Sequence, residues 1–125
     1  ISRGLVGSEM CIRDRKYDIQ NLAFGTDCVG KANVHESQMQ ELGAIEKTFD
    51  TITALRMATS NCGRLFELST YKHPYQEGKL GQIVEGAYAD LLIVDGNPLE
   101  GVDCVMLDET KKVIMKDGVI YKNTL

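Results

Sequence analysis

The chain has 125 residues and a formal net charge of −4, from 14 basic and 18 acidic side chains. A chain of this length can bury one modest hydrophobic core. Its Lys and Arg residues form no basic block, which argues against a nucleic-acid partner because phosphate binding needs clustered positive charge. No apolar run approaches the roughly 20 residues of a membrane span, so we expect no membrane partner either.

The cysteines and the start of the chain bear on the compartment. The four thiols are scattered and form no C-x-x-C pair: Cys11, Cys28, Cys62 and Cys104. This pattern argues against a metal knuckle and favours free thiols in a reducing compartment such as the cytoplasm. The first residue is Ile1 rather than Met, which fits a reading frame cut open upstream, so the lack of a signal peptide is uninformative.

The first fifteen residues differ from the rest of the chain. Translated back into codons, the run from Gly4 to Arg15 resembles the transposon adapter used to build sequencing libraries. The run has no helical or strand periodicity and no caps. We therefore predict that residues 1–15 are a disordered tail of artificial origin and that natural sequence begins near Lys16.

One strand and then helices are expected up to residue 78. The apolar run Ile19–Gly25 ends at glycine and predicts a buried strand. Three helices follow, each with apolar residues on one face: 35–47, 51–58 and 61–68. Asp50 and Ser60 are the expected N-caps of the second and third helices. A polar loop is expected over 70–78.

The periodicity changes to that of strands after residue 80. The strands expected there are 82–84, 90–94, 104–107, 112–116 and 119–121. Asp117-Gly118 predicts a tight hairpin between the last two, and Asp95-Gly96-Asn97-Pro98 is a strong turn signal. A strand, helices and then a run of strands indicate one βα unit followed by a small antiparallel sheet.

Asp27 is the candidate for chemistry. It comes directly after the predicted buried strand and has Gly25 and Gly30 on either side, which let the backbone turn sharply. In a barrel, a carboxylate at that end of a strand lies on the face that holds active sites. From spacing alone, a structural turn and a catalytic role both remain open.

Three stretches carry a family resemblance: Phe24–Asp27, Leu80–Leu99 and Ile114–Asn123. Together they resemble the C-terminal signature of the metal-dependent amidohydrolase superfamily, in particular its imidazolonepropionase-like and prolidase-like members. The fold that this implies is the last βα unit of a (β/α)8 barrel over 16–78, followed by the C-terminal part of an accessory β-sandwich over 79–125. Such a barrel needs roughly 250 residues, so we expect an incomplete domain.

The resemblance also implies an activity and site residues. It implies a fragment of a hydrolase that cleaves carbon–nitrogen bonds, in non-peptide amides or dipeptides, through a metal-activated water. Asp27 would bind the metal and take up the proton, whereas His35 and Cys28 are candidate substrate contacts. The cofactor implied is zinc, as one or two ions in the full-length enzyme. With two histidines and no His-x-His pair, the fragment alone should bind no metal and be inactive.

Other polar residues are interpreted as structural. His73 is expected at the surface and Thr59-Ser60-Asn61 in N-capping. Asp90 and Asp95 flank an apolar strand of the accessory sheet that the resemblance implies, and Asp95-Gly96 is typical of a turn. The partners implied are a small amide, cyclic amide or dipeptide substrate, the missing N-terminal part of the same chain, and a second copy in a homo-oligomer. A non-enzymatic β-rich interaction module and a degenerate family member without metal remain as alternatives, because the sheet should keep an open edge and an uncovered apolar face.

Overall fold

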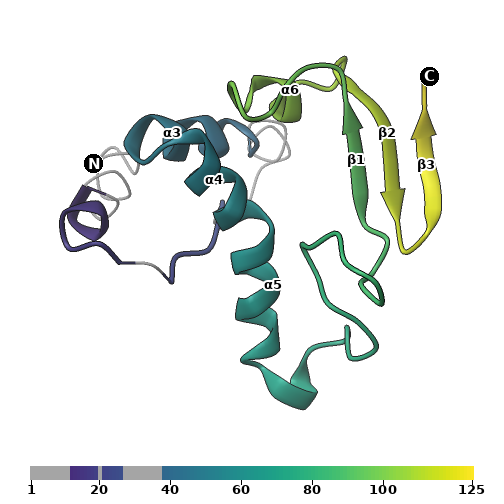
Figure 1. Ribbon diagram of the computed structural model, residues 1–125, viewed down its shortest axis with the longest axis horizontal. Coiled ribbons are helices and arrows are strands. Elements are labelled where there is room, and N and C mark those ends of the chain that lie inside the picture. The colour runs from purple at the N-terminus through teal and green to yellow at the C-terminus, as the bar shows by residue number, and fades with distance from the viewer. Residues whose placement is uncertain (1–11, 20, 27–37) are drawn as a thin grey trace.

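The computed structural model describes residues 12–19, 21–26 and 38–125. Figure 1 shows the helices on one side, a sheet on the other, and a short helix between them at one end. The elements in chain order are α3 (Gln40–Thr48), α4 (Thr51–Ala58), α5 (Ser60–Glu67), the 3-10 helix η1 (Thr70–Lys72), β1 (Leu91–Val94), α6 (Asp103–Met106), β2 (Lys111–Lys116) and β3 (Val119–Asn123). Within the described residues, no helix is both long and apolar enough to cross a membrane.

The start of the chain departs from two expectations. Residues 12–16 are helical, and the Arg15 guanidinium donates a hydrogen bond to the Thr48 carbonyl at 2.6 Å, although no regular structure was expected before Lys16. The strand predicted over Ile19–Gly25 is wrong, because no strand is assigned to the described residues of that range. A strand is defined by pairing with another strand, and the Phe24 amide instead donates to a helix, at the Met57 carbonyl, over 2.9 Å.

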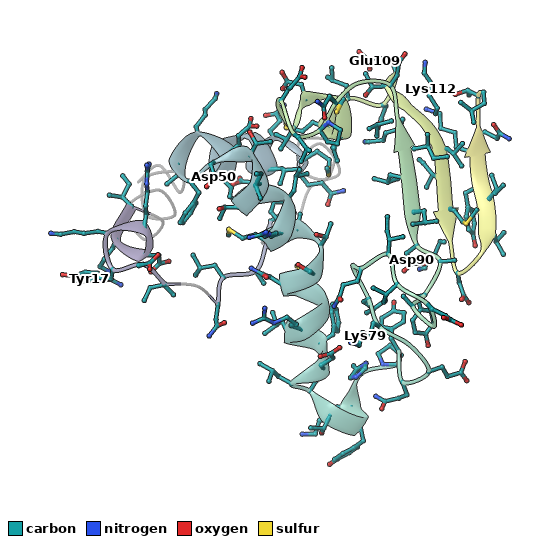
Figure 2. All side chains as sticks on the ribbon, in the orientation of Figure 1. Tyr17, Asp50, Lys79, Asp90, Glu109 and Lys112 are labelled. Atoms are coloured by element: carbon teal, nitrogen blue, oxygen red, sulfur yellow. The ribbon has the colours of Figure 1, made fainter. Side chains whose placement is uncertain are left out.

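The α3–α4 corner follows local sequence signals. Asp50 adopts an extended backbone, and its side chain accepts a hydrogen bond from the Thr53 amide at 2.9 Å, which confirms it as the N-cap of α4. The helix predicted over 35–47 is confirmed for 40–47, whereas 35–37 lie outside the described residues. Figure 2 labels Asp50 beside this corner.

The predicted cap of α5 is wrong. The helix already includes Ser60, and Thr59 occupies the N-cap position without a side-chain capping bond. The Thr59 hydroxyl donates instead to the Leu55 carbonyl at 2.7 Å. Only this residue separates α4 from α5, so the backbone carbonyl of Thr59 can accept from the Gly63 amide at 3.0 Å as the first bond of α5.

The core lies where α3, α4 and the start of α6 meet. Three fully buried side chains form its centre: Leu42, Ala54 and Val102. The side chains packed around them come from the same elements and from the segment at Phe24. Because Val102 directly precedes α6, this contact attaches the sheet half of the chain to the helices.

The sheet is antiparallel, in the order β1-β2-β3, as the sequence predicts. Asp117 and Gly118 link β2 to β3 with φ of 49° and 74°, and two positive φ values in a two-residue loop identify a type I′ turn. The predicted hairpin is therefore confirmed. Many apolar side chains of the sheet remain exposed by a third or more: Leu91, Leu92, Ile93, Val119, Ile120 and Tyr121.

Two predicted strands are wrong. The range 104–107 falls largely in the four-residue helix α6, in which Cys104 is the buried residue. A short apolar run fits a helical turn and a strand equally well, so its periodicity could not decide between them. The range 82–84 forms no strand, and Ile83 is 90% exposed.

Candidate functional site

The three candidate site residues Asp27, Cys28 and His35 lie outside the described residues. The structure does describe the segment that leads to them, Asn21–Thr26, together with the helices against which it lies. This segment ends at the residue before Asp27.

This supporting segment is held by the junction of α4 and α5. The Asn61 side-chain amide donates to the Leu22 carbonyl at 2.7 Å, and the Phe24 amide donates to the Met57 carbonyl at 2.9 Å. The Cys62 thiol lies 3.4 Å from the Phe24 carbonyl oxygen and 3.1 Å from that of Met57. The segment is thus fixed at two residues, two positions apart, by main-chain and side-chain groups of the helices.

The N-capping interpretation of Thr59-Ser60-Asn61 is corrected by these contacts. Asn61 reaches a carbonyl 39 residues earlier in the chain, and neither Thr59 nor Ser60 makes a side-chain cap of α5. One feature of the sequence is consistent with this contact: asparagine has a side-chain amide that can donate a hydrogen bond to a carbonyl outside its own helix. Its partner could not be identified without the tertiary structure.

A polar hollow of about 480 Å³ lies beside the same segment. Three arginines and three aspartates contribute to its described lining: Arg15, Arg56, Arg64, Asp14, Asp18 and Asp50. Because positive and negative side chains are equal in number among these six, their charges favour neither a cation nor an anion in the hollow.

His73 has a local structural role. Its side chain is half-buried, and Nδ1 accepts a hydrogen bond from the Tyr75 amide at 3.2 Å within the turn that follows η1. The Tyr75 ring makes edge-to-face contacts with Phe66 and Tyr88, with ring centroids 6.0 Å and 5.6 Å apart. The expected surface position is therefore only partly right, and the imidazole serves the turn.

Asp90 and Asp95 serve the sheet, as interpreted from the sequence. Asp90 accepts a hydrogen bond from the Asp117 amide at 2.7 Å and so supports the β2–β3 turn. Asp95 lies 3.5 Å from the Lys112 ammonium, at the other end of β1. Figure 2 shows Asp90 and Lys112 at opposite ends of the sheet, so the two carboxylates do not form an acid–base pair.

The described residues also place a lysine under the loop between α6 and β2. Lys111 is buried and donates to the Met106 carbonyl at 3.2 Å and to the Asp108 carboxylate at 2.7 Å. The hydrogen bond and the charge of Lys111 lower the pKa of Asp108. The Lys111 ammonium therefore holds the loop between α6 and β2 through these two contacts, which indicates a structural role.

A metal centre is not formed by the described residues alone. Among them, no group of three or more His, Cys, Asp or Glu side chains could hold an ion. Zinc sites in proteins use three or four protein ligands. Any metal bound through Asp27 would therefore need ligands from elsewhere.

Comparison with solved structures identifies a related fold. The chain matches an amidohydrolase crystal structure with a TM-score of 0.75 and 33% sequence identity, over 91% of this chain and 25% of that one. It also matches a prolidase in complex with N-methylphosphonate-L-proline, with a TM-score of 0.74 and 26% identity over 94% and 26% of the two chains. A third match, to a protein described as uncharacterized, has a TM-score of 0.78 and 28% identity over 98% and 28%.

No protein-family model matches the chain, and no curated protein does. The chain spans about a quarter of the length of the solved structures that it matches. Its helices and antiparallel sheet correspond to one part of those proteins, in agreement with the incomplete domain expected from the sequence. In sequence and fold, the chain is an amidohydrolase-like fragment.

Proposed function

We propose that this chain is part of a metal-dependent hydrolase that cleaves carbon–nitrogen bonds in small amides, cyclic amides or dipeptides. The observation that carries the proposal is the 33% identity to an amidohydrolase over 91% of the chain, at a TM-score of 0.75. The similarity to a prolidase bound to a proline phosphonate supports a dipeptide as one substrate class.

Asp27 has the central role in this proposal. We propose it as a metal ligand and as the group that takes the proton from the attacking water and passes it to the leaving nitrogen. A carboxylate suits both tasks because it is anionic at neutral pH and can exchange a proton within hydrogen-bond reach. His35 and Cys28, which follow it in sequence, are proposed as substrate contacts.

The proposed cofactor is zinc, as one or two ions, with most ligands supplied by parts of the longer enzyme that precede this chain. A divalent ion would lower the pKa of a bound water towards 7. The described residues hold no set of three ligands. Titration of the isolated 125-residue chain with zinc in a calorimeter should show no saturable binding, and a tight single-site isotherm would refute this assignment.

The test of the activity is Asp27→Asn in the complete enzyme, assayed on a panel of N-acyl amino acids, cyclic amides and X-Pro dipeptides. Turnover should fall by orders of magnitude while the circular dichroism spectrum stays unchanged. Asp90→Asn is the matched control, because it makes the same chemical change at a carboxylate that supports a sheet turn. Wild-type turnover in Asp27→Asn would remove this residue from its proposed role.

A second candidate is a non-enzymatic module that binds a partner strand at an edge of the sheet. The exposed apolar side chains of β1 and β3 favour it, because an open strand edge can pair with an extended peptide. The two candidates differ in what the gene encodes upstream of residue 16. A His-x-His strand there supports the hydrolase, and a genuine start codon near Lys16 supports the module.

A further inference from the structure

We propose that the turn after η1 is a pH-sensitive switch. Protonation of His73 opens the turn and frees the Tyr75 ring from the aromatic contacts that connect α5 to the chain before β1. All the residues of this switch are described by the structure, and its operation does not require the proposed hydrolase function.

The hydrogen bond at His73 requires a neutral imidazole. Nδ1 accepts from the Tyr75 amide at 3.2 Å in a partly buried place, and a backbone amide can only donate. In the imidazolium both ring nitrogens carry a proton, so Nδ1 would face the amide as a second donor. The closed turn therefore binds the neutral side chain, and a fall in pH shifts the equilibrium towards the open turn.

The surroundings of His73 offer no negative charge to balance an added proton. The imidazole lines a hollow between the end of α5, η1 and the turn, and Lys72 is the only other charged side chain among its described lining residues. The remaining lining side chains are apolar or carry a hydroxyl group. The Tyr75 phenol follows in sequence, and phenols are uncharged at neutral pH. Neither ion pair of the described residues includes His73, so protonation places a second cation beside Lys72.

Backbone strain at the start of the turn also favours opening. Thr70 has a φ of 50°, which a β-branched residue rarely adopts and which persists only when neighbouring contacts hold it. The Gln76 side-chain amide supplies two such contacts, to the Thr70 carbonyl at 2.8 Å and to the His73 carbonyl at 2.6 Å. Once the Tyr75 amide is released, the Gln76 bonds have to hold this strained turn without it.

The Tyr75 ring couples the turn to two other segments. It packs edge-to-face against Phe66 of α5 and against Tyr88, which lies three residues before β1. Figure 1 shows the chain that leads from η1 to β1 between α5 and the sheet. A second close approach, of Gly63 in α5 to Leu80, does not include the turn. We therefore expect a local opening of the turn and its ring contacts, with α5 still packed at Leu80.

The experiment compares the complete protein at pH 8 and pH 5, a range in which histidine side chains ordinarily titrate. Amide hydrogen exchange in peptides covering 70–78, corrected for the intrinsic effect of pH on exchange, should be about three- to tenfold faster at pH 5, the factor for loss of one hydrogen bond. Hydroxyl-radical labelling of the Tyr75 ring should rise similarly relative to Tyr71, which is already 82% exposed. Corrected exchange in peptides from α4 should not change, and a uniform increase along the chain would overturn the local switch.

His73→Asn is the matched variant. An asparagine oxygen can accept from the amide two residues later but does not titrate, so exchange and labelling should stay at the wild-type pH 8 level at both pH values. His73→Ala has no acceptor and should show the open turn at both pH values. The proposal is overturned if the pH effect persists in His73→Asn, if the wild type shows none, or if His73→Ala matches the wild type at pH 8.

Discussion

The carboxylate of Glu46 accepts a hydrogen bond from the backbone amide of Val102 at 3.1 Å, across 56 residues of chain. The same oxygen accepts from the Thr51 hydroxyl at 2.7 Å. One half-buried side chain of α3 thus ties the start of α4 to the residue before α6, whose own side chain is fully buried in the core. This link and the core contact of Val102 join the helices to the part of the chain that carries the sheet.

Replacement of Glu46 by alanine should lower the free energy of unfolding by about 1–3 kcal/mol, because the Val102 amide loses its acceptor in a partly buried place. Glu46→Gln keeps an oxygen acceptor and should cost less. Urea denaturation followed by circular dichroism measures both. Equal stability of the alanine variant and the wild type would show that water replaces the carboxylate without loss.

Gly63→Ala should destabilise the protein by about 1–3 kcal/mol despite the better helix propensity of alanine, because overpacking outweighs it. A Cβ on Gly63 would lie 2.9 Å from the carbonyl carbon of Leu80 and closer still to its oxygen, so α5 and the chain at Leu80 would have to separate. Gly101→Ala is the control, since its Cβ meets only the Glu46 carboxylate at 3.9 Å. The same denaturation experiment applies, and a neutral Gly63→Ala would contradict the close packing.

The N-cap of α4 should make stability depend on pH in acid. Hydrogen bonds from the Thr53 amide and hydroxyl lower the pKa of Asp50 below its ordinary value of 3.8. A lowered pKa in the folded state means that the stabilisation is present above the unfolded pKa and is lost as the pH falls through the folded one. Asp50→Ala should cost about 1 kcal/mol at pH 7, with the cost shrinking towards pH 2.

Asp50→Asn separates capping from charge in that experiment. Asparagine also caps helices but does not titrate, so its stability difference from Asp50→Ala should stay constant between pH 7 and pH 2. Thermal melts across this range provide the measurement. A difference between aspartate and alanine that does not change with pH would contradict the assigned pKa direction.

The isolated chain should associate through its sheet, and a charge on β3 should reduce that association. Ile120 is 52% exposed on an edge strand, and lysine at such positions opposes edge-to-edge pairing. Ile120→Lys should therefore increase the monomer fraction in sedimentation velocity. Ile52→Lys is the matched control, because Ile52 is 49% exposed on α4, away from the sheet. Equal effects of the two variants would indicate general solubility instead.

The elements that the sequence predicted correctly are those set by local chemistry. Asp50 caps α4 because its side chain reaches an amide three residues later, and Asp117-Gly118 forms the hairpin because its residues accept positive φ. Both depend on neighbours in the chain, so they can be recognised from the sequence alone. The similarity to amidohydrolases could also be recognised there, since it lies in contiguous motifs, and the solved structures support it.

The tertiary structure decided what depends on distant partners. The run Ile19–Gly25 is as apolar as a strand, yet its described backbone bonds to α4 and α5 rather than to another strand. The range 104–107 is largely helical. Its short apolar run suits one helical turn as well as a strand, so the sequence alone could not decide between them. The role of Asn61 near the candidate site also depends on a partner distant in sequence. Its sequence position suggested a cap, and only the contact with Leu22 assigned it to the segment before Asp27, because the periodicity of a sequence carries no information about which distant carbonyl a side chain will meet.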